Sequence, residues 1–218
     1  MHNEWPMRAS IDHLAVAAAS LDGRLLDDVL GVSLSPGGRH VRMGTHNRLL
    51  RLGDDTYLEL IAVDPQAPPP AHPRWFELDE AAMPGRLAEG PRLVHWVARV
   101  DTTELPPLSF DVGPWEPFER GDLSWRQTVR ADGKLPADGV VPSLICWSGS
   151  AHPAARLPES GVRLEALELK HPRASEVQQQ LDLLGLDVRC SRSALPGIIA
   201  HLRTPSGPRT LRSTEPIR

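Results

Sequence analysis

Residues 11–63 read IDHLAVAAASLDGRLLDDVLGVSLSPGGRHVRMGTHNRLLRLGDDTYLELIAV. In the first seven of these residues, β-branched and small apolar side chains surround one histidine, which is typical of a strand. After Ser20, a potential helix cap, apolar residues recur with the helical period up to Leu30, and Gly31 supplies a left-handed stop. Turn residues then separate three further apolar runs, at residues 40–43, 47–52 and 57–63. The sequence therefore predicts the element order β-α-β-β-β.

The middle of the chain is interrupted by proline. Residues 64–92 are proline-rich, so most of this segment is excluded from a sheet and is expected to run over the surface as a linker. Trp75 and Phe76 are expected to anchor it through one or two buried helical turns. A second, helix-poor module is predicted over residues 93–148, with an irregular, proline-broken segment where the helix should lie.

The end of the chain repeats the first pattern. A strand at residues 162–169 precedes an apolar helical stripe that starts after Pro172 and stops at Gly185, and three short strands follow. We therefore predict a third βαβββ module over residues 161–213.

Composition limits the class of protein. The 218 residues are 40% hydrophobic and 24% charged, which indicates an ordered globular chain. A net charge of -4 makes nucleic acid an unexpected partner. Two cysteines without a CxxC motif exclude a disulfide framework and a zinc finger. With no signal-like start and no membrane-length apolar run, we predict a soluble cytoplasmic protein without a membrane partner.

Two polar side chains interrupt otherwise apolar strands. Side chains alternate between the faces of a strand, so His13 lies with apolar neighbours in the first strand and Glu59 does so in the fourth. An inward carboxylate is costly unless it is hydrogen-bonded, paired or bound to a metal. The same argument applies more weakly to His95. No motif of a serine hydrolase, a P-loop, a dinucleotide-binding fold or an HExxH metalloprotease occurs.

These residues resemble a known family, the glyoxalase-like domain proteins of the vicinal oxygen chelate superfamily. The resemblance rests on Ile11-Asp12-His13-Leu14, Leu30-Gly31-Val32, Gly37-Gly38-Arg39-His40, Met43-Gly44-Thr45-His46-Asn47 and Tyr57-Leu58-Glu59-Leu60-Ile61. It implies an α+β fold in which repeated βαβββ modules form curled, cup-like mixed sheets. Such a cup holds a divalent metal and an oxygen-bearing small molecule, with ligands from the first and fourth strands of two modules.

Carried over by position, the resemblance makes His13, Glu59 and His95 metal ligands. Cys146 stands in the region where the fourth ligand, a glutamate, is expected. Two imidazoles and one carboxylate suit non-haem iron or a catalytic zinc, with nickel and manganese as further candidates. Cys146 is either a thiolate ligand or a small buried hydrophobe, and His13 has the alternative of being a hydrogen-bonded core histidine. The alternative to a metal-bound cup is that the metal site has been lost and that the cup binds its ligand through hydrogen bonds alone.

Other polar residues are candidates for contact with the substrate. Thr45, His46 and Asn47 open one strand, and Arg126 is suited to clamp a substrate carboxylate. Glu59 is the candidate catalytic carboxylate, but it cannot easily be both a permanent ligand and a free base. His46 is therefore the reserve proton carrier.

The resemblance leaves three functions open for a small-molecule substrate. The first is an isomerase or lyase that polarises vicinal oxygens on a divalent metal. The second is an iron-dependent dioxygenase, and the third is a binding protein without turnover. The module at residues 161–213 lacks candidate ligands and is expected to complete the sheet or to form a homodimer across a two-fold axis.

Overall fold

The computed structural model describes residues 8–218, and its first part follows the predicted element order. The elements are β1 (Ser10–Ala17), α1 (Leu25–Leu30), β2 (Ser35–His40), the single turn η1 (Val41–Met43), β3 (Thr45–Arg51) and β4 (Tyr57–Val63). Helix α1 is shorter than expected. The Ser20 hydroxyl bonds to Asp22 instead of capping the helix, while Gly31 ends the helix in the left-handed region as predicted.

The second module has four strands and no helix between its first two. They are β5 (Arg92–Arg99), β6 (Trp115–Arg120), β7 (Leu123–Thr128) and β8 (Ser143–Trp147), with the short turn η2 (Pro136–Gly139) before β8. Strand β6 was missed because Pro117 argues against a strand. Pro117 is tolerated because β6 lies at the edge of its sheet, where a missing N–H leaves no partner unpaired.

These eight strands form one curled sheet in the order β2-β3-β4-β1-β5-β8-β7-β6. The two modules repeat the same pairing, since β1 is parallel to β4 and β5 is parallel to β8, and they meet along the antiparallel pair β1–β5. The curl brings the two edge strands together. Arg42 donates to the Pro117 carbonyl at 2.7 Å and pairs with Glu116 at 2.9 Å across this gap. The predicted α+β fold with curled sheets is confirmed.

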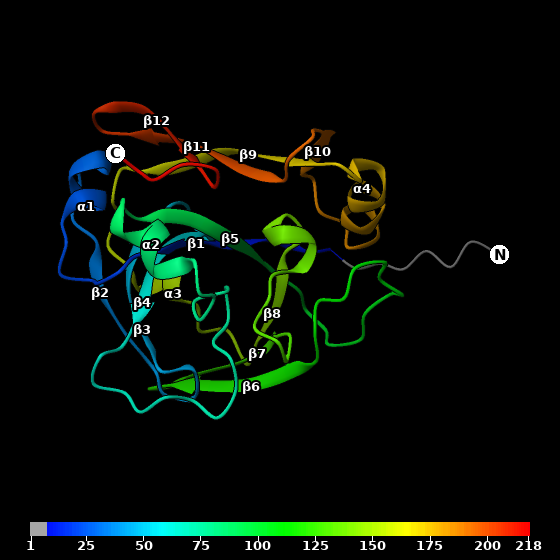
Figure 1. Ribbon diagram of the computed structural model, residues 1–218, viewed down its shortest axis with the longest axis horizontal. Helices are drawn as coiled ribbons and strands as arrows, with labels where there is room; N and C mark the ends of the chain where they lie inside the picture. Colours follow the sequence, from blue (N-terminus) through cyan, green and yellow to red (C-terminus); the bar gives the residue numbers. More distant parts are fainter. Residues whose placement is uncertain (1–7) are drawn as a thin grey trace.

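The proline-rich segment at residues 64–91, which includes α2 (Met83–Ala88), crosses the concave side of this sheet, and we call it the strap (Figure 1). Its aromatic pair is buried, as expected from the sequence. Trp75 and Phe76 are 4% and 3% exposed and pack in the inner core with Ile61 and Ile145. Burial of these two large aromatic side chains stabilises the fold more than exposure to solvent would.

The aromatic pair of the strap does not form the helical turn that was expected. Phe76 and Glu77 are consecutive left-handed residues, with φ of 59° and 58°. Such residues are strained, so other contacts must hold them. The Glu77 N–H donates to the Gly133 carbonyl at 3.0 Å, and the Glu77 carboxylate accepts from the Leu135 N–H at 3.3 Å.

The remaining elements build a separate layer. After α3 (Pro153–Arg156), β9 (Arg163–His171), α4 (Ala174–Leu183), β10 (Arg189–Arg192), β11 (Gly197–Thr204) and β12 (Gly207–Arg212) appear in the predicted order. Their pairing differs from that of the first module, because β9 is parallel to the next strand, β10, and antiparallel to β11. The segment therefore shares the element order of the first module without its sheet topology.

This four-stranded sheet covers the convex face of the larger sheet, as Figure 1 shows, and does not extend it. Leu14, Leu58 and Trp96 from the convex face share one core with Leu169 and Leu202. The expectation that the segment completes the larger sheet is therefore wrong. Within residues 8–218, no helix has the length and apolarity needed to cross a membrane.

Candidate functional site

His13 and Glu59 lie side by side on the concave face. In the parallel pairing of β1 with β4, His13 is opposite Tyr57 and Ala15 is opposite Glu59. The Nε2 atom of His13 lies 3.7 Å from Oε2 of Glu59, and both side chains are buried. They line a cavity of about 20 Å³ together with His40, Asn47, Tyr57, Trp75, Phe76, Arg120, Trp125, Gln127, Ile145 and Trp147.

The imidazole of His13 is held from behind by a buried carboxylate. Asp12 is fully buried, and Oδ1 of Asp12 lies 2.7 Å from Nδ1 of His13. Its other oxygen accepts from Nε1 of Trp147 and Nε2 of His152, each at 2.9 Å. A register shift between Ile11 and His13 in the β1–β5 pairing marks the bulge at which these consecutive side chains meet.

The charge state of Asp12 decides where the proton of His13 lies. Burial raises the pKa of Asp12, but hydrogen bonds from His13 and His152 outweigh burial and hold that pKa below its usual value. The carboxylate accepts the proton of Nδ1, so we infer that Nε2 of His13 carries the lone pair. His152 is fixed in the opposite sense, because its Nδ1 accepts from the Ala154 N–H and its Nε2 donates to Asp12.

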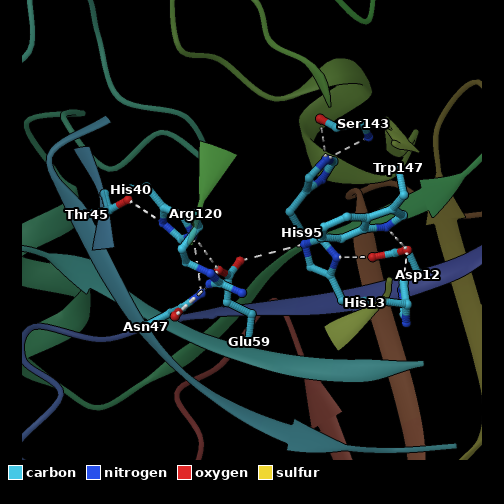
Figure 2. A network of polar contacts seen from close by, with 11 residues as sticks. Asp12, His13, His40, Thr45, Asn47, Glu59, His95, Arg120, Ser143 and Trp147 are labelled. Atoms are coloured by element: carbon cyan, nitrogen blue, oxygen red, sulfur yellow. Dashed lines mark hydrogen bonds and ion pairs between the residues drawn. The ribbon is translucent and has the colours of Figure 1, made fainter. Parts of the chain in front are cut away.

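A second group of polar residues surrounds Glu59 (Figure 2). Asn47 donates through Nδ2 to Oε1 of Glu59 at 2.6 Å, and Nη1 of Arg120 donates to Oδ1 of Asn47 at 3.3 Å. Nδ1 of His40 lies 3.0 Å from the Thr45 hydroxyl, and its Nε2 lies 3.7 Å from Glu59. Burial lowers the pKa of His40 to about 4 against the opposing effect of Glu59, so His40 is neutral at pH 7.

Two glycines allow Asn47 and Arg120 to approach. The Gly38 N–H donates to Oδ1 of Asn47 at 2.8 Å. A Cβ atom on Gly37 would meet that oxygen at 2.0 Å, and one on Gly38 would meet Cδ of Arg120 at 2.5 Å. Side chains at these positions would displace the two polar groups. The Gly37-Gly38 pair of the sequence motif thus leaves the space that Asn47 and Arg120 occupy at the cavity.

His95 reaches the concave side but presents no free nitrogen. Its ring lies under Phe76, with centroids 5.5 Å apart, and does not line the cavity. Nδ1 lies 3.0 Å from the Gly139 carbonyl, and Nε2 accepts from the Ser143 N–H at 3.0 Å. Burial lowers the pKa of His95 to about 3. The expected metal ligand is here a hydrogen-bonded core histidine.

Cys146, Arg126 and His46 lie on strands that reach the cavity, but on the opposite faces. Strand β8 directs Ile145 and Trp147 into the cavity, so the intervening Cys146 faces outward, opposite Arg126 in the pairing with β7. Burial also raises the pKa of the Cys146 thiol, which disfavours the thiolate that a metal needs. The expected ligand role of Cys146 and the expected carboxylate clamp at Arg126 therefore have no support in this geometry.

Strand β3 shows the same alternation. Thr45 and Asn47 face inward, where they contact His40 and Glu59, while His46 between them faces outward. Of the three expected substrate-binding residues on this strand, Asn47 lines the cavity, Thr45 lies behind His40, and His46 is turned away. The expected role of His46 as reserve proton carrier is therefore corrected.

The donor set does not fit a resident divalent metal. His13 and Glu59 are the two expected ligands that line the cavity. His40 lines it too, but Nδ2 of Asn47 lies 3.4 Å from Nε2 of His40 and donates to Oε1 of Glu59, so an amide already contacts both groups. No three His, Cys, Asp or Glu side chains within residues 8–218 converge as a metal site. Register explains the missing acid. Ala15 pairs with Glu59 in the first module, and the corresponding Val97 pairs with Ser143 in the second.

Several cavity residues were missed by the sequence analysis. Arg120 lies on the unpredicted strand β6, and alternation with Phe118 would have placed it inside once that strand was assigned. Asp12 was hidden because alternation alone assigns it to the face opposite His13. Trp75 lies in the strap, where no periodicity indicates a direction.

Comparison with known proteins gives one family match and several similar structures. A family model described as a glyoxalase-like domain matches residues 11–185. A hypothetical protein from Staphylococcus aureus aligns with a TM-score of 0.53 and 15% identity, over 94% of this chain and 85% of that chain. A methylmalonyl-CoA epimerase from Mycobacterium tuberculosis aligns with a TM-score of 0.35 and 15% identity, over 65% and 88%. The search of curated proteins finds no match. The chain belongs to the glyoxalase-like domain family.

Proposed function

We propose that this chain is a glyoxalase-like enzyme of the isomerase or lyase type that moves a proton on a small oxygen-bearing substrate without a resident metal. Nε2 of His13 is the proposed base. One observation carries the proposal: the buried Asp12 carboxylate holds Nδ1 of His13 at 2.7 Å, while Nε2 is directed into the cavity toward Glu59. Orientation of an imidazole by a carboxylate is a recurrent way to prepare a general base.

The surrounding residues suit proton transfer next to a carbonyl group. A C–H proton of the substrate moves to Nε2 of His13, and the resulting imidazolium lies between the carboxylates of Asp12 and Glu59. Return of that proton to a neighbouring atom completes an isomerisation without an oxidant or a reductant. Burial raises the pKa of Tyr57 well above its usual value, so its hydroxyl stays protonated in the lining of the same cavity.

The alternatives named from the sequence differ in what they require of the second module. A dioxygenase needs two histidines and one carboxylate around iron. Gly139 and Ser143 hold the nitrogens of His95, and the Asn47 amide contacts both Nε2 of His40 and Oε1 of Glu59. A binding protein needs the cavity alone and no base. The preparation of His13 by Asp12 favours the enzyme over the binding protein.

The test is exchange of substrate hydrogens with solvent. The protein is treated with a chelator, placed in D₂O with a panel of small 2-hydroxy and 2-oxo acids and their amides, and followed by NMR. We expect deuterium at the carbon next to the carbonyl group in at least one compound, with a rate that the chelator does not change. His13→Gln should slow this exchange by a factor of about 100 or more, as expected for loss of a general base.

A matched control is available in the smaller sheet. His201 also pairs with a carboxylate, Glu168 at 2.8 Å, but lies at the surface. His201→Gln should leave the rate unchanged, and circular dichroism should show that both variants are folded. Exchange that disappears with the chelator and returns with added Zn²⁺ or Fe²⁺ would contradict the metal-independent base, and so would equal rates for His13→Gln and the unaltered protein.

A further inference from the structure

Two buried hydrogen-bond donors of the cavity wall have no partner. The indole nitrogens of Trp75 and Trp125 are buried, and neither has a hydrogen-bond acceptor among residues 8–218. Both side chains line the cavity beside His13 and Glu59, and they are 4% and 5% exposed. A buried donor without a partner costs about 1–3 kcal/mol, and buried tryptophans usually find an acceptor. A ligand with acceptor oxygens would satisfy both donors.

The same wall contains a cation without a counter-ion. Among residues 8–218, the bond from Nη1 to Asn47 is the only hydrogen bond of the Arg120 guanidinium, and no carboxylate of these residues forms an ion pair with it. Most arginines of this chain are paired, as with Arg156 and Asp122 or Arg48 and Asp27. An arginine held at a cavity without an acid partner is a ready site for an anionic group.

We propose that this wall, formed by Trp75, Trp125 and Arg120, binds the carboxylate of the substrate. The inference rests on the proposed function in one respect, namely that the cavity is the substrate site. It adds the substrate class: a small carboxylic acid whose carbon next to the carboxylate or carbonyl group faces His13. The wall and the base come from different parts of the chain, since His13 lies on β1, Trp125 on β7 and Trp75 on the strap.

The charges around the cavity favour a singly charged carboxylate. Glu59 and Asp12 already place two carboxylates near His13, so a doubly charged phosphate meets more repulsion than a carboxylate does. Asn47 separates the two signs, because its Oδ1 accepts from Arg120 and its Nδ2 donates to Glu59. The substrate carboxylate is therefore expected at the Arg120 end of the cavity and its reacting carbon at the His13 end.

Size places a further condition on the ligand. A cavity of about 20 Å³ has room for one water-sized group. Even acetate therefore requires a shift of the strap that carries Trp75 and Phe76. Phe76 and Glu77 have strained backbone conformations, so relief of that strain would offset part of the cost of moving this segment.

The test is titration of the ¹⁵N-labelled, full-length protein with acetate and glycolate, and separately with acetamide and inorganic phosphate. Two-dimensional NMR resolves the indole N–H signals, and Trp75→Phe and Trp125→Phe assign those of the wall by their disappearance. We expect both signals to move downfield with the carboxylates. Acetamide, which carries no charge, and phosphate should bind at least about tenfold more weakly, the loss expected for one charge-assisted hydrogen bond.

Arginine variants sharpen the result. Arg120→Gln should weaken acetate binding by about tenfold to a hundredfold. Arg120→Lys should recover part of the loss, because lysine restores the positive charge without the paired N–H donors of a guanidinium. Arg126→Gln is the matched control, since Arg126 lies on the neighbouring strand and faces solvent. It should bind acetate like the unaltered protein.

The possible results separate the two proposals. Acetate binding that His13→Gln retains, together with loss of exchange, supports both. Acetate binding without any exchange in the unaltered protein contradicts the enzymatic proposal and leaves the carboxylate site standing. Indole signals that do not move with acetate, equal affinity for phosphate, or equal loss in Arg120→Gln and Arg126→Gln would overturn the carboxylate site, even where exchange is observed with an amide.

Discussion

The two modules of the cup place a histidine in corresponding strands and treat it in opposite ways. In the first module, His13 faces Glu59 across 3.7 Å, and its Nε2 is available to the cavity. In the second, His95 faces Ser143, and the Ser143 N–H and hydroxyl both lie 3.0 Å from its Nε2. The register is the same, because Ala15 pairs with Glu59 and Val97 pairs with Ser143.

The difference shows how one side chain changes the role of its neighbour. A glutamate is long enough to stand apart from the facing imidazole and leave space between them. Serine is short, so the strand and the imidazole meet directly and the histidine becomes part of the core. The first module thus leaves an imidazole nitrogen at the cavity, whereas the second holds its imidazole in the core by hydrogen bonds.

The largest change in the free energy of unfolding is expected for replacement of Asp12, which orients His13. Asp12→Asn replaces a buried acceptor of three hydrogen bonds with an amide, and we expect a loss of about 3 kcal/mol or more in the free energy of unfolding. Ser143→Ala should cost about 1 kcal/mol, because the main-chain N–H still satisfies His95. Urea denaturation measures both values. Equal losses would show that the two histidines are held in the same way.

Acid should destabilise the protein through its buried histidines. The pKa of His95 is lowered to about 3 and that of His40 to about 4, from a usual value of 6.5. The unfolded chain therefore binds protons first as the pH falls below 6.5. The free energy of unfolding should drop by several kcal/mol, on the order of 1.4 kcal/mol for each unit by which a histidine pKa is lowered on folding.

Asp12 has its effect in a lower range of pH. Its pKa is held below 3.8 in the folded protein, so its contribution is present above that value and is lost as the pH falls further. Melting temperatures from pH 7.5 to 4.5 test the histidines separately from Asp12. His95→Gln should flatten the pH dependence, and an unchanged slope would contradict a neutral His95.

The smallest effect is expected at the outward face of β8. Cys146→Ser should change the free energy of unfolding by less than about 0.5–1 kcal/mol, because the side chain is only partly buried. It should also leave the exchange rate of the unaltered protein intact. A tenfold slower exchange would show that Cys146 reaches the substrate and that Ser143 is the wrong counterpart of Glu59.

The sequence was sufficient where strands are regular. Period-two alternation assigned His13 and Glu59 to the apolar faces of their own strands, and the family resemblance placed both residues in one cup. Alternation failed at Asp12, where a bulge brings consecutive side chains together. Cys146 was misplaced because the inward positions of a strand change with a shift of one residue, and the sequence does not fix that register in β8.

Other parts of the site depend on contacts that no local pattern indicates. The wall residue Arg120 lies on a strand that contains Pro117. A proline is tolerated in this strand because the strand lies at the edge of the sheet, which is known only from the complete sheet. Trp75 reaches the cavity from a segment without periodicity, held by the loop at Gly133. Gly133 is required there, since a Cβ atom would meet the Arg74 carbonyl at 2.5 Å.

The layer over the convex face also has a consequence for the order of events during synthesis. A ribosome releases the chain from its amino end, so both modules of the cup, complete at Trp147, emerge before β9 begins at Arg163. Until β11 and β12 follow, leucines such as Leu14 and Leu58 have no covering layer. The strands of the smaller sheet thus determine when a nascent chain is protected from aggregation. Release of the chain before they are made would leave the apolar convex face of the larger sheet exposed and prone to aggregate.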